Sequence, residues 1–492
     1  MINPSVASQS AGATTIGFEP SHRKPALLRH PAGAGAARSR PEPTAGAGNP
    51  ACPWGSSVVH AAGERTSERP LGAGTSQTAG VPLEEDFAPD PEGLQQALRR
   101  LIEVRSRLGS AHVDSPLVLD LPRTLPEAGV GGRAALERLA GPGLEHATRL
   151  DHPGFLAHMD PPTPWMTWAA TAWAAAVNQN LLHPDTAPAA RQLEPLVIDW
   201  LAPAFGMGGG HLVPGSTLAN LTALWAAREL TGARRVVASS AAHISIAKAA
   251  RILGLDLVQV PVDDRQRLRA DALLDDLSDA VLVLTAGTVA TGAIDPLDAG
   301  PRAAWRHVDA AWAGPLRLSG HAHLLDGIEA ADSVAVSAHK WLYQPKESAL
   351  VLFGEPERAH AALSFSGGYL AAPNVGLLGS HAHTALPLAV TLLAWGSTGV
   401  AGRIEADMDL ADRLADLVAG AAHLELWNRP VTGVVNWRPR EQDPAAVRSR
   451  LRGAWISLAD IAGDSWFRSV SANPLADPEH VINAVLQAYH TR

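Results

Sequence analysis

The chain has 492 residues, enough for two or three domains, and its apolar content of 46 % is ordinary for a globular protein. Its formal net charge of −9 argues against a nucleic-acid-binding surface, which would be basic. The single cysteine excludes an internal disulfide and a cysteine-based zinc site and suits a reducing compartment. We see no apolar run of the roughly 18 residues that a membrane span requires. Together with the charge and the cysteine count, this predicts a cytoplasmic protein without a metal, nucleic-acid or membrane partner.

Residues 1–85 differ in composition from the rest of the chain. Ala, Gly, Ser, Pro and Arg dominate there without sustained periodicity. Such a segment buries too little apolar surface to offset the entropy lost on ordering. It also lacks the hydrophobic stretch of a secretory signal. We interpret it as a disordered tail, or as sequence translated from an upstream start codon, rather than as a transit peptide.

Residues 86–150 are predicted to form an N-terminal helical segment. Leu94, Leu98, Leu101 and Ile102 recur at helical spacing, which predicts a helix over 91–108. A linker rich in Pro and Gly then runs to residue 152. Packed helices are predicted over 165–182 and 191–205.

Strands and helices alternate from residue 210 onward. Short apolar strands are predicted over 211–213, 235–239, 255–260, 280–285, 305–308, 333–336 and 349–353, with helices over 215–229, 245–253 and 271–277. This alternation is typical of an α/β domain with a mostly parallel sheet covered on both faces, which we assign to residues 151–384. Such sheets bind ligands at the carboxyl ends of their strands.

The pattern changes after residue 384, and we assign residues 385–492 to a smaller α+β domain. Helices are predicted over 385–404, 409–420 and 477–489, and strands around 431–437 and 466–471.

Two strand ends carry the residues that indicate a cofactor. Lys340, one of only four lysines, follows the strand over 333–336 closely, and Asp309 follows another strand 31 residues upstream. A partly desolvated lysine can attack a carbonyl group, whereas the guanidinium of arginine is always protonated. Together they suggest pyridoxal phosphate, with Lys340 holding its aldehyde carbon and Asp309 pairing with the pyridinium nitrogen.

Small and hydroxyl residues open the helix that follows residue 214. Ser216 and Thr217, after Gly215, suit a phosphate site, because free N–H groups and the positive end of the helix dipole face the anion. Plain N-capping is the alternative. His243 follows a strand and can stack on a flat ring, although a lone histidine is more often unremarkable.

Two further residues, His339 and Arg468, have two interpretations each. His339 hydrogen-bonds or stacks near the cofactor, or it only packs. Arg468 interrupts an apolar stretch and is a candidate to bind the substrate α-carboxylate as a fork, or it is an outward-facing strand residue. His307 and Trp312 flank Asp309 and would shape the wall of the site.

These residues lie in stretches that resemble the group II pyridoxal-phosphate-dependent amino-acid decarboxylases. That family includes the glutamate, aromatic amino-acid, cysteine sulfinate and 2,4-diaminobutyrate enzymes. The resemblance runs from about residue 152 to the C-terminus and is carried by residues 152–155, 215–221, 242–243, 287–288, 292–296, 309–314, 337–341 and 467–474.

The resemblance implies a fold and a set of site residues. The fold would be the aminotransferase-like fold type I, in a homodimer with active sites at the interface. It implies a cofactor site made of Ser216, Thr217, His243, Thr288, Asp309, Ala311, Ser337, His339 and Lys340. Substrate would contact Arg468, Phe155 and His158, with further residues supplied by the partner subunit.

Tyr369 bears on the reaction that the resemblance implies. It lies in a Gly-rich stretch suited to a mobile loop, where the family has a tyrosine that protonates the substrate carbon and aldehyde-forming relatives have phenylalanine. A buried loop anchor is the alternative. The chain departs from the family pattern at several positions, which leaves the substrate open: Leu218, Val289, Ser337, Ala338, Ser380 and His381.

We therefore predict a carboxy-lyase that converts an L-amino acid, of non-aromatic type, to its amine and carbon dioxide. Lys340, Asp309, His243 and Tyr369 would be its catalytic residues. A transaminase, another lyase or an aldehyde-forming oxidative deaminase are the alternatives, because fold alone does not determine the reaction. A non-catalytic protein is disfavoured, since a scaffold needs none of these residues.

Overall fold

The computed structural model describes residues 87–106 and 121–491, so the predicted tail over 1–85 lies outside the described residues. Residues Val81–Arg492 form one unit. Its first elements are α2 (Pro91–Ser106), α3 (Gly132–Ala140) and the short π-helix η1 (Gly141–Glu145). The helix α3 was not predicted as a separate element, because Gly131 and Gly141 flank it and the surrounding stretch is rich in Pro and Gly. The proposed boundaries at residues 150 and 384 stay predictions.

Two helices lead into the large sheet. They are α4 (Trp165–Val177), α5 (Ala190–Leu201) and its 3₁₀ extension η2 (Ala202–Phe205). The helix α4 ends five residues earlier than predicted, since Asn178 adopts a left-handed conformation with φ of 41°. Asparagine tolerates this conformation better than most residues and commonly ends a helix in this way.

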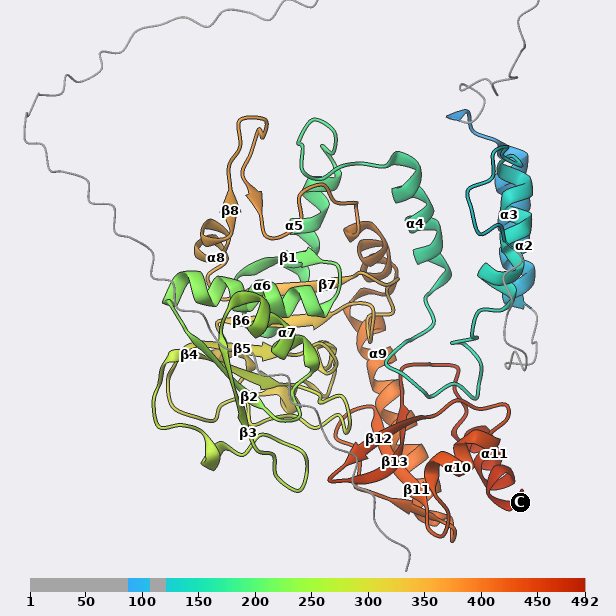
Figure 1. The fold of residues 1–492 in the computed structure, drawn as a ribbon, viewed down its shortest axis with the longest axis vertical. Coiled ribbons are helices and arrows are strands. Elements are labelled where there is room, and N and C mark those ends of the chain that lie inside the picture. The colour runs from blue at the N-terminus through green and yellow to red at the C-terminus, as the bar shows by residue number, and fades with distance from the viewer. Residues whose placement is uncertain (1–86, 107–120, 492) are drawn as a thin grey trace, which may run out of the picture. The chain divides into compact units, whose positions relative to one another are not determined.

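The large sheet has seven strands, all of them near their predicted positions. They are β1 (Gly209–Val213), β2 (Arg235–Ser239), β3 (Asp256–Val260), β4 (Leu277–Thr285), β5 (Ala303–Asp309), β6 (Ser333–Ser337) and β7 (Ala349–Phe353). Their order is β1-β7-β6-β5-β4-β2-β3 (Figure 1). Only β7 runs antiparallel to its neighbours, so the prediction of a mostly parallel sheet is confirmed.

Helices cover both faces of this sheet. Val236 and Ala238 of β2 pack in one core with α6 (Ser216–Thr231) and α7 (Ile244–Leu253). Val237, between them, packs in a second core with α5 and with α9 (Ala385–Gly420). Successive side chains of a strand point to opposite faces, so strands that are apolar throughout can be buried on both sides.

The connections between strands are mostly short. They contain the 3₁₀ segments η3 (Ala270–Ala272), η4 (Gly314–Leu318), η5 (Ala322–Leu325) and η6 (Ile328–Ala330). The helix predicted over 271–277 was wrong. Asp276 accepts a hydrogen bond from the backbone N–H of Ser278, a local turn that competes with a helix, and Leu277 is fully buried as the first residue of β4.

A small hairpin follows the large sheet. The helix α8 (Pro356–Ala362) precedes β8 (Ser364–Phe365), which pairs antiparallel with β9 (Asn374–Val375). Figure 1 shows the β8–β9 connection extending away from the seven-stranded sheet.

A four-stranded antiparallel sheet forms the C-terminal part. It is built from β10 (Leu424–Leu426), β11 (Val434–Pro439), β12 (Ser457–Ile461) and β13 (Asp464–Val470), in the order β10-β11-β13-β12. The helices α10 (Pro444–Arg450) and α11 (Pro478–His490) complete it. The sequence predicted β11, β13 and α11; β10 is too short and β12 too polar to stand out.

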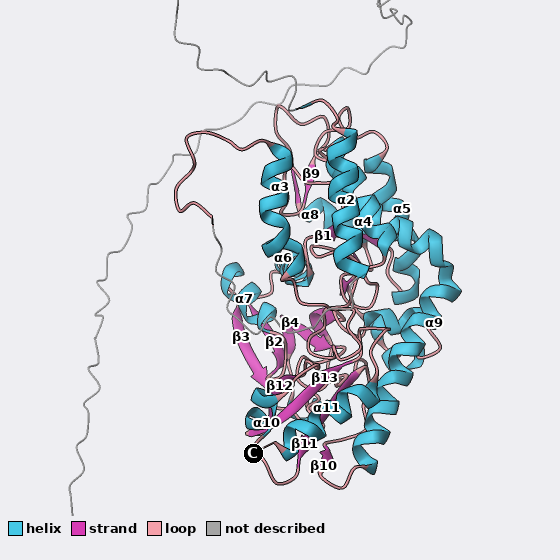
Figure 2. Ribbon diagram, turned by 90° about the vertical axis from the view of Figure 1, so that its right-hand side faces the viewer, coloured by secondary structure: helices cyan, strands magenta, loops and turns pink. Residues whose placement is uncertain are grey.

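Helix α9 joins the two sheets. The predicted break near residues 405–408 was wrong: the helix continues there and is kinked instead at Gly396, where φ is 60°. Figure 2 shows α9 extending from beside α5 to β10 and β11. The same helix corrects the expectation that the chain has no apolar run of about 18 residues, since α9 is long and apolar enough to cross a membrane by length and composition. Core helices pass the same test, and α9 contributes side chains to two hydrophobic cores.

Candidate active site

A cavity of about 240 Å³ lies where the parallel strands of the large sheet end. β4 ends at Thr285 and β5 at Asp309, while Lys340 follows the end of β6. From the predicted site, the cavity is lined by Ser216, Thr217, His243, Asp309, Ala311, His339 and Lys340. Seven predicted residues from four separate segments of the chain therefore face one space.

Lys340 has the character of a nucleophile. Its side chain is half-buried, and burial lowers its pKa from the ordinary value. The attraction of Asp309 opposes this shift, and the positive charges of Arg468 and Lys346 add to it. Trp341, fully buried against Trp312 with ring centroids 4.2 Å apart, fixes the turn that carries the lysine. A lowered pKa increases the fraction of neutral, reactive amine.

Asp309 is held by a hydrogen bond on each carboxylate oxygen. Oδ2 accepts from Asn220 Nδ2 at 2.9 Å, and Oδ1 accepts from the backbone N–H of Ala311 at 3.2 Å. The residue is only 4 % exposed. A carboxylate has more acceptor sites than these two bonds use, so Asp309 can still accept a proton donor from the cavity.

The start of α6 fits a phosphate group. Gly215 adopts φ of 93°, and no side chain caps the helix, so plain N-capping is not what Ser216 does. The hydroxyls of Ser216 and Ser337 are buried and have no hydrogen-bond partner. Unpaired buried hydroxyls are costly, and an anion bound at the helix N-terminus would pair with them. The residues present therefore fit pyridoxal phosphate.

Two histidines border the cavity. His243 caps α7: its Nδ1 accepts from the backbone N–H of Ser245 at 3.2 Å and lies 2.8 Å from the Ser245 hydroxyl. Partial burial lowers the pKa of His243, against the pull of Asp309. Burial lowers the pKa of His339 to about 4, and its Nδ1 is buried without a partner. Both rings are neutral at neutral pH and available to a ligand.

Thr288 lies behind the wall of the cavity. Its hydroxyl lies 2.9 Å from that of Thr291 and accepts from the backbone N–H of Ala293, which holds the turn after β4. Gly287, which does line the cavity, has φ of 97°, and a Cβ there would lie 2.7 Å from Trp312 Cδ1. The turn thus needs glycine at this position, while Thr288 has a supporting place rather than a lining one.

Arg468 is buried beside the cavity and does not point outward. Its Nε donates to the carbonyl of Val289 at 2.6 Å, and Val289 lines the cavity. Burial lowers the pKa of Arg468 to about 10, against the attraction of Asp160. Among the described residues no carboxylate lies within ion-pair distance of it. A buried guanidinium without a carboxylate is suited to accept one from a ligand.

Besides Thr288 and Arg468, four predicted residues do not line this cavity: Ser337, which ends β6, Tyr369, Phe155 and His158. Tyr369 lies between β8 and β9 with 76 % of its surface exposed, so it is not a buried loop anchor. Phe155 and His158 line a separate hollow with Arg448 and Trp455. Their predicted contacts with substrate stay predictions.

The sequence also missed residues that the structure brings to the site. Thr285 ends β4 and lines the cavity, and its hydroxyl is buried without a partner. The sequence could have indicated Thr285, because it ends a predicted strand, as Asp309 ends the neighbouring one. Asn220 lies four residues after Ser216, about one helical turn, which places it on the same face of α6 and toward the sheet.

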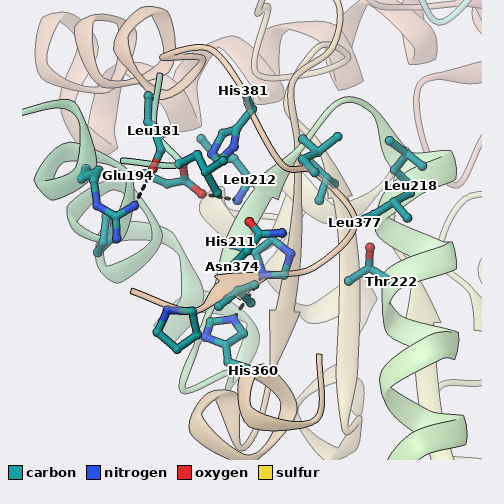
Figure 3. Close-up of a pocket in the computed structure, with 18 residues that line it drawn as sticks. Leu181, Glu194, His211, Leu212, Leu218, Thr222, His360, Asn374, Leu377 and His381 are labelled. Carbon is teal, nitrogen blue, oxygen red and sulfur yellow. Dashed lines mark hydrogen bonds between the residues drawn. The ribbon is translucent and has the colours of Figure 1, made fainter. Parts of the chain in front are cut away.

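A second cavity of about 240 Å³ lies beside β1 (Figure 3). Glu194 accepts from the backbone N–H of Leu212 at 2.9 Å, and His211 Nδ1 lies 3.1 Å from His360 Nε2. Burial raises the pKa of Glu194 and lowers that of His211 to about 3. No lysine lines this cavity, and nowhere in residues 87–106 and 121–491 does a His, Cys, Asp and Glu group suit a metal ion.

Comparisons with known proteins agree with this geometry. Residues 137–440 match the family described as the pyridoxal-dependent decarboxylase conserved domain. The chain is 30 % identical over 410 residues to L-2,4-diaminobutyrate decarboxylase of Rhizobium meliloti strain 1021, covering 74 % of this chain and 82 % of the relative. It is 28 % identical over 377 residues to aspartate 1-decarboxylase of Aliivibrio fischeri, covering 64 % and 69 %.

Solved structures share the fold. The glutamate decarboxylase domain of a Vibrio parahaemolyticus protein superimposes with a TM-score of 0.73 at 22 % identity, covering 84 % of this chain and all of that one. Oryza sativa TDC, solved with PLP and tryptamine, superimposes with a TM-score of 0.72 at 22 % identity, covering 84 % and 98 %.

The predicted fold type I, the pyridoxal phosphate cofactor and the decarboxylation of an amino acid are thereby confirmed, and the alternative reactions are not favoured. The chain belongs to the pyridoxal-dependent decarboxylase family.

Proposed function

We propose that the protein decarboxylates a non-aromatic L-amino acid to its amine in the cavity around Lys340. The observation that carries this proposal is the meeting of a lysine of lowered pKa, a hydrogen-bonded carboxylate and unpaired buried hydroxyls in one cavity. When bound, pyridoxal phosphate supplies an electron sink for the electron pair that carbon dioxide leaves behind.

Each residue of the predicted cofactor site has a task in this proposal. Lys340 would hold the aldehyde carbon of the cofactor through its amine. Asp309 holds the proton on the ring nitrogen, because a nearby negative charge favours the charged form of that nitrogen. Hydroxyls of Ser216, Thr217 and Ser337 donate to the phosphate. His243 stacks on the ring, while Ala311 and His339 border it; Thr288 supports the turn behind the wall.

Arg468 is proposed to bind the substrate α-carboxylate. Its Nε is occupied by the carbonyl of Val289 and its Nη1 lies 3.3 Å from the Ser457 hydroxyl, which fixes the plane of the guanidinium. A carboxylate held by such a fork has a defined orientation. A fixed α-carboxylate would keep the bond that breaks in one orientation relative to a cofactor held at Lys340 and Asp309.

The rim of the cavity supports a polar rather than an aromatic substrate side chain. Asp160 pairs with Lys346, and both charges act on the pKa of Lys340. Met159, next to Asp160, lines the cavity. A side chain with a charge of its own can exchange with one member of this exposed pair, whereas an aromatic ring cannot. The 2,4-diaminobutyrate and aspartate decarboxylases among the relatives act on such substrates by name.

Tyr369 is proposed to protonate the carbon that carbon dioxide leaves, and to do so within a homodimer. Its exposure, and its absence from the cavity around Lys340 in the same chain, support approach from a partner subunit. Phe365 and Leu377, 56 % and 55 % exposed near the same hairpin, are apolar side chains that a partner would cover. Phe155 and His158 are retained as proposed substrate contacts.

Product analysis tests this proposal. Purified protein is supplied with pyridoxal phosphate and a pool of L-amino acids, and products are identified by mass spectrometry beside a Lys340→Ala control. An amine formed by the wild type alone supports decarboxylation and identifies the substrate. A keto acid or an aldehyde as the main product contradicts it, and preferred consumption of an aromatic amino acid contradicts the proposed substrate class.

A cytoplasmic location is also proposed, which the single cysteine in 492 residues supports. Cell fractionation checks it: we expect activity in the soluble fraction, and recovery with membranes or outside the cell would contradict it.

A further inference from the structure

A chain of buried hydrogen bonds leads away from Asp309 into the core. Asn220 Nδ2 donates to Asp309 at 2.9 Å, and Asn220 Oδ1 lies 2.9 Å from His307 Nε2. His307 Nδ1 lies 2.9 Å from the hydroxyl of Ser333, which accepts from Trp305 Nε1 at 2.8 Å. Asn220, His307 and Ser333 have no exposed surface. The function described above does not account for these three residues.

The direction of every bond in this chain follows from Asp309. A carboxylate only accepts, so the amide nitrogen of Asn220 must face Asp309 and the amide oxygen must face His307. That oxygen also only accepts, so His307 carries its proton on Nε2. Burial lowers the pKa of His307 to about 4, so the ring is neutral and its Nδ1 accepts from the Ser333 hydroxyl. Donors and acceptors match at each step.

The same amide group controls His243. A second bond from Asn220 Nδ2 runs to the Ser245 hydroxyl at 2.9 Å, and this hydroxyl lies 2.8 Å from His243 Nδ1. Because the Ser245 backbone N–H also donates to His243 Nδ1, that nitrogen is unprotonated and accepts the hydroxyl proton. Asn220 is therefore the branch point between the carboxylate at the ring nitrogen and the histidine that stacks on the ring.

We propose that Asn220 and His307 are positioning residues of this enzyme: together they orient the Asp309 carboxylate and, because Asn220 donates to the Ser245 hydroxyl, direct the proton of that hydroxyl to His243 Nδ1. The proposal rests on the proposed roles of Asp309 and His243. Neither Asn220 nor His307 lines the cavity, so both act through these two residues. In a buried network of this kind each bond strengthens its neighbours, and one lost partner leaves costly unpaired groups.

Cofactor binding by the apoenzyme provides the test, since it does not depend on turnover. We would measure the affinity for pyridoxal phosphate by equilibrium dialysis and the visible absorbance of the bound cofactor across a pH series. For Asn220→Ala we expect affinity to fall roughly 10- to 100-fold, the range found when outer partners of a ligand residue are removed. We also expect the pH dependence of the absorbance to move, because Asp309 no longer has a fixed orientation.

Asn220→Asp separates positioning from packing. The substituted side chain keeps the shape of asparagine but replaces the donor that faces Asp309 with an acceptor, and two adjacent carboxylates repel. We expect an altered absorbance–pH profile here as well. In both Asn220 variants kcat should fall more than KM rises, since Asn220 does not reach the substrate.

Two control variants separate the proposal from a general loss of stability. Ser333→Ala removes the partner of His307 Nδ1 but leaves both hydrogen bonds of Asn220 Nδ2 in place, so we expect lower stability and a much smaller loss of cofactor affinity than in Asn220→Ala, less than about threefold. Trp437→Phe removes a buried bond of 2.9 Å to Ser469 in the core of the small domain. It should lower the melting temperature and leave the affinity and absorbance of the cofactor unchanged.

The outcomes are distinguishable. Wild-type affinity and an unchanged absorbance–pH profile in both Asn220 variants would overturn the proposal, as would Trp437→Phe reproducing their effects. If the wild type binds the cofactor but forms no amine, the proposed function fails while the network is still tested by affinity and absorbance.

Discussion

Two cavities of the large domain, one around Lys340 and one beside β1, have about the same volume, and of these two only the first has the chemistry of an active site. In the cavity beside β1, Glu194 pairs with a backbone N–H and His211 with His360 (Figure 3). His381 Nδ1 lies 2.8 Å from the carbonyl oxygen of Gly379. In the cavity around Lys340, the Ser216 and Thr285 hydroxyls and His339 Nδ1 are buried without partners. The two cavities have about the same volume but differ in whether their buried polar groups have hydrogen-bond partners. Unpaired polar groups therefore indicate the ligand site here better than volume does.

The largest expected effect separates the two cavities by their reactive group. Lys340→Arg keeps the positive charge but replaces the amine with a guanidinium that stays protonated. We expect the rate of amine formation to fall on the order of 10³-fold or more, together with loss of the absorbance of the lysine-bound cofactor. Lys248→Arg, on the exposed face of α7, is the matched control and should behave as wild type. Normal turnover by Lys340→Arg would contradict the assignment of the active site to the cavity around Lys340.

Tyr369→Phe tests whether the cavity around Lys340 is complete within one chain. Loss of the proton donor should slow amine formation about 100-fold, the usual contribution of a general acid. Tyr489→Phe is the control and should leave the rate of amine formation unchanged. The Tyr489 hydroxyl, 3.2 Å from Glu441, lies in the small domain.

Mixed dimers of Tyr369→Phe and Lys340→Ala subunits sharpen this test. If Tyr369 serves the partner's site, half the dimers are hybrids with one competent site each, so about a quarter of wild-type activity returns. No recovery would mean that Tyr369 acts within its own chain.

Arg468→Met tests the substrate side of the same cavity. Loss of the fork for the α-carboxylate should raise KM roughly 10- to 100-fold while the cofactor absorbance is retained. Arg438→Met is the control: this arginine, on the neighbouring strand β11, pairs with Glu425 and Asp464 at the surface. Unchanged KM in Arg468→Met would remove the proposed carboxylate site.

The smallest effect on catalysis is expected in the second cavity. The pKa of His211 is about 3 in the folded chain against 6.5 for an unperturbed histidine, so the unfolded chain binds more protons between these values. Stability from this group is present above pH 6.5 and is lost as pH falls. For His211→Gln we expect turnover within about twofold of wild type and a shallower loss of stability in acid, by up to about 2–3 kcal/mol over the first two pH units. A large loss of activity at neutral pH would show that this cavity takes part in catalysis.

Most of the large sheet and the centre of the site could be predicted from sequence, because both depend on local pattern. Strands β2 and β7 have the predicted bounds, and Asp309 and Lys340 lie at strand ends that a parallel order must bring together. Asn220 and Thr285 could not be assigned, since their roles depend on which groups fold against them. The place of Tyr369 was not predictable either, since a hairpin says nothing about which chain it serves.

Helix α9 has a consequence for how the molecule comes apart. Its first part, including Leu388 and Ile404, packs in the core of the large sheet, while Leu414 and Val418 pack in the core of the small one. The part of α9 after the kink at Gly396 holds Ile404, Leu414 and Val418, so one unbroken helical stretch contributes to both cores, and neither core can unfold without removing partners from it. Heat or denaturant should therefore unfold residues 121–491 in a single cooperative transition, although they contain two separate sheets.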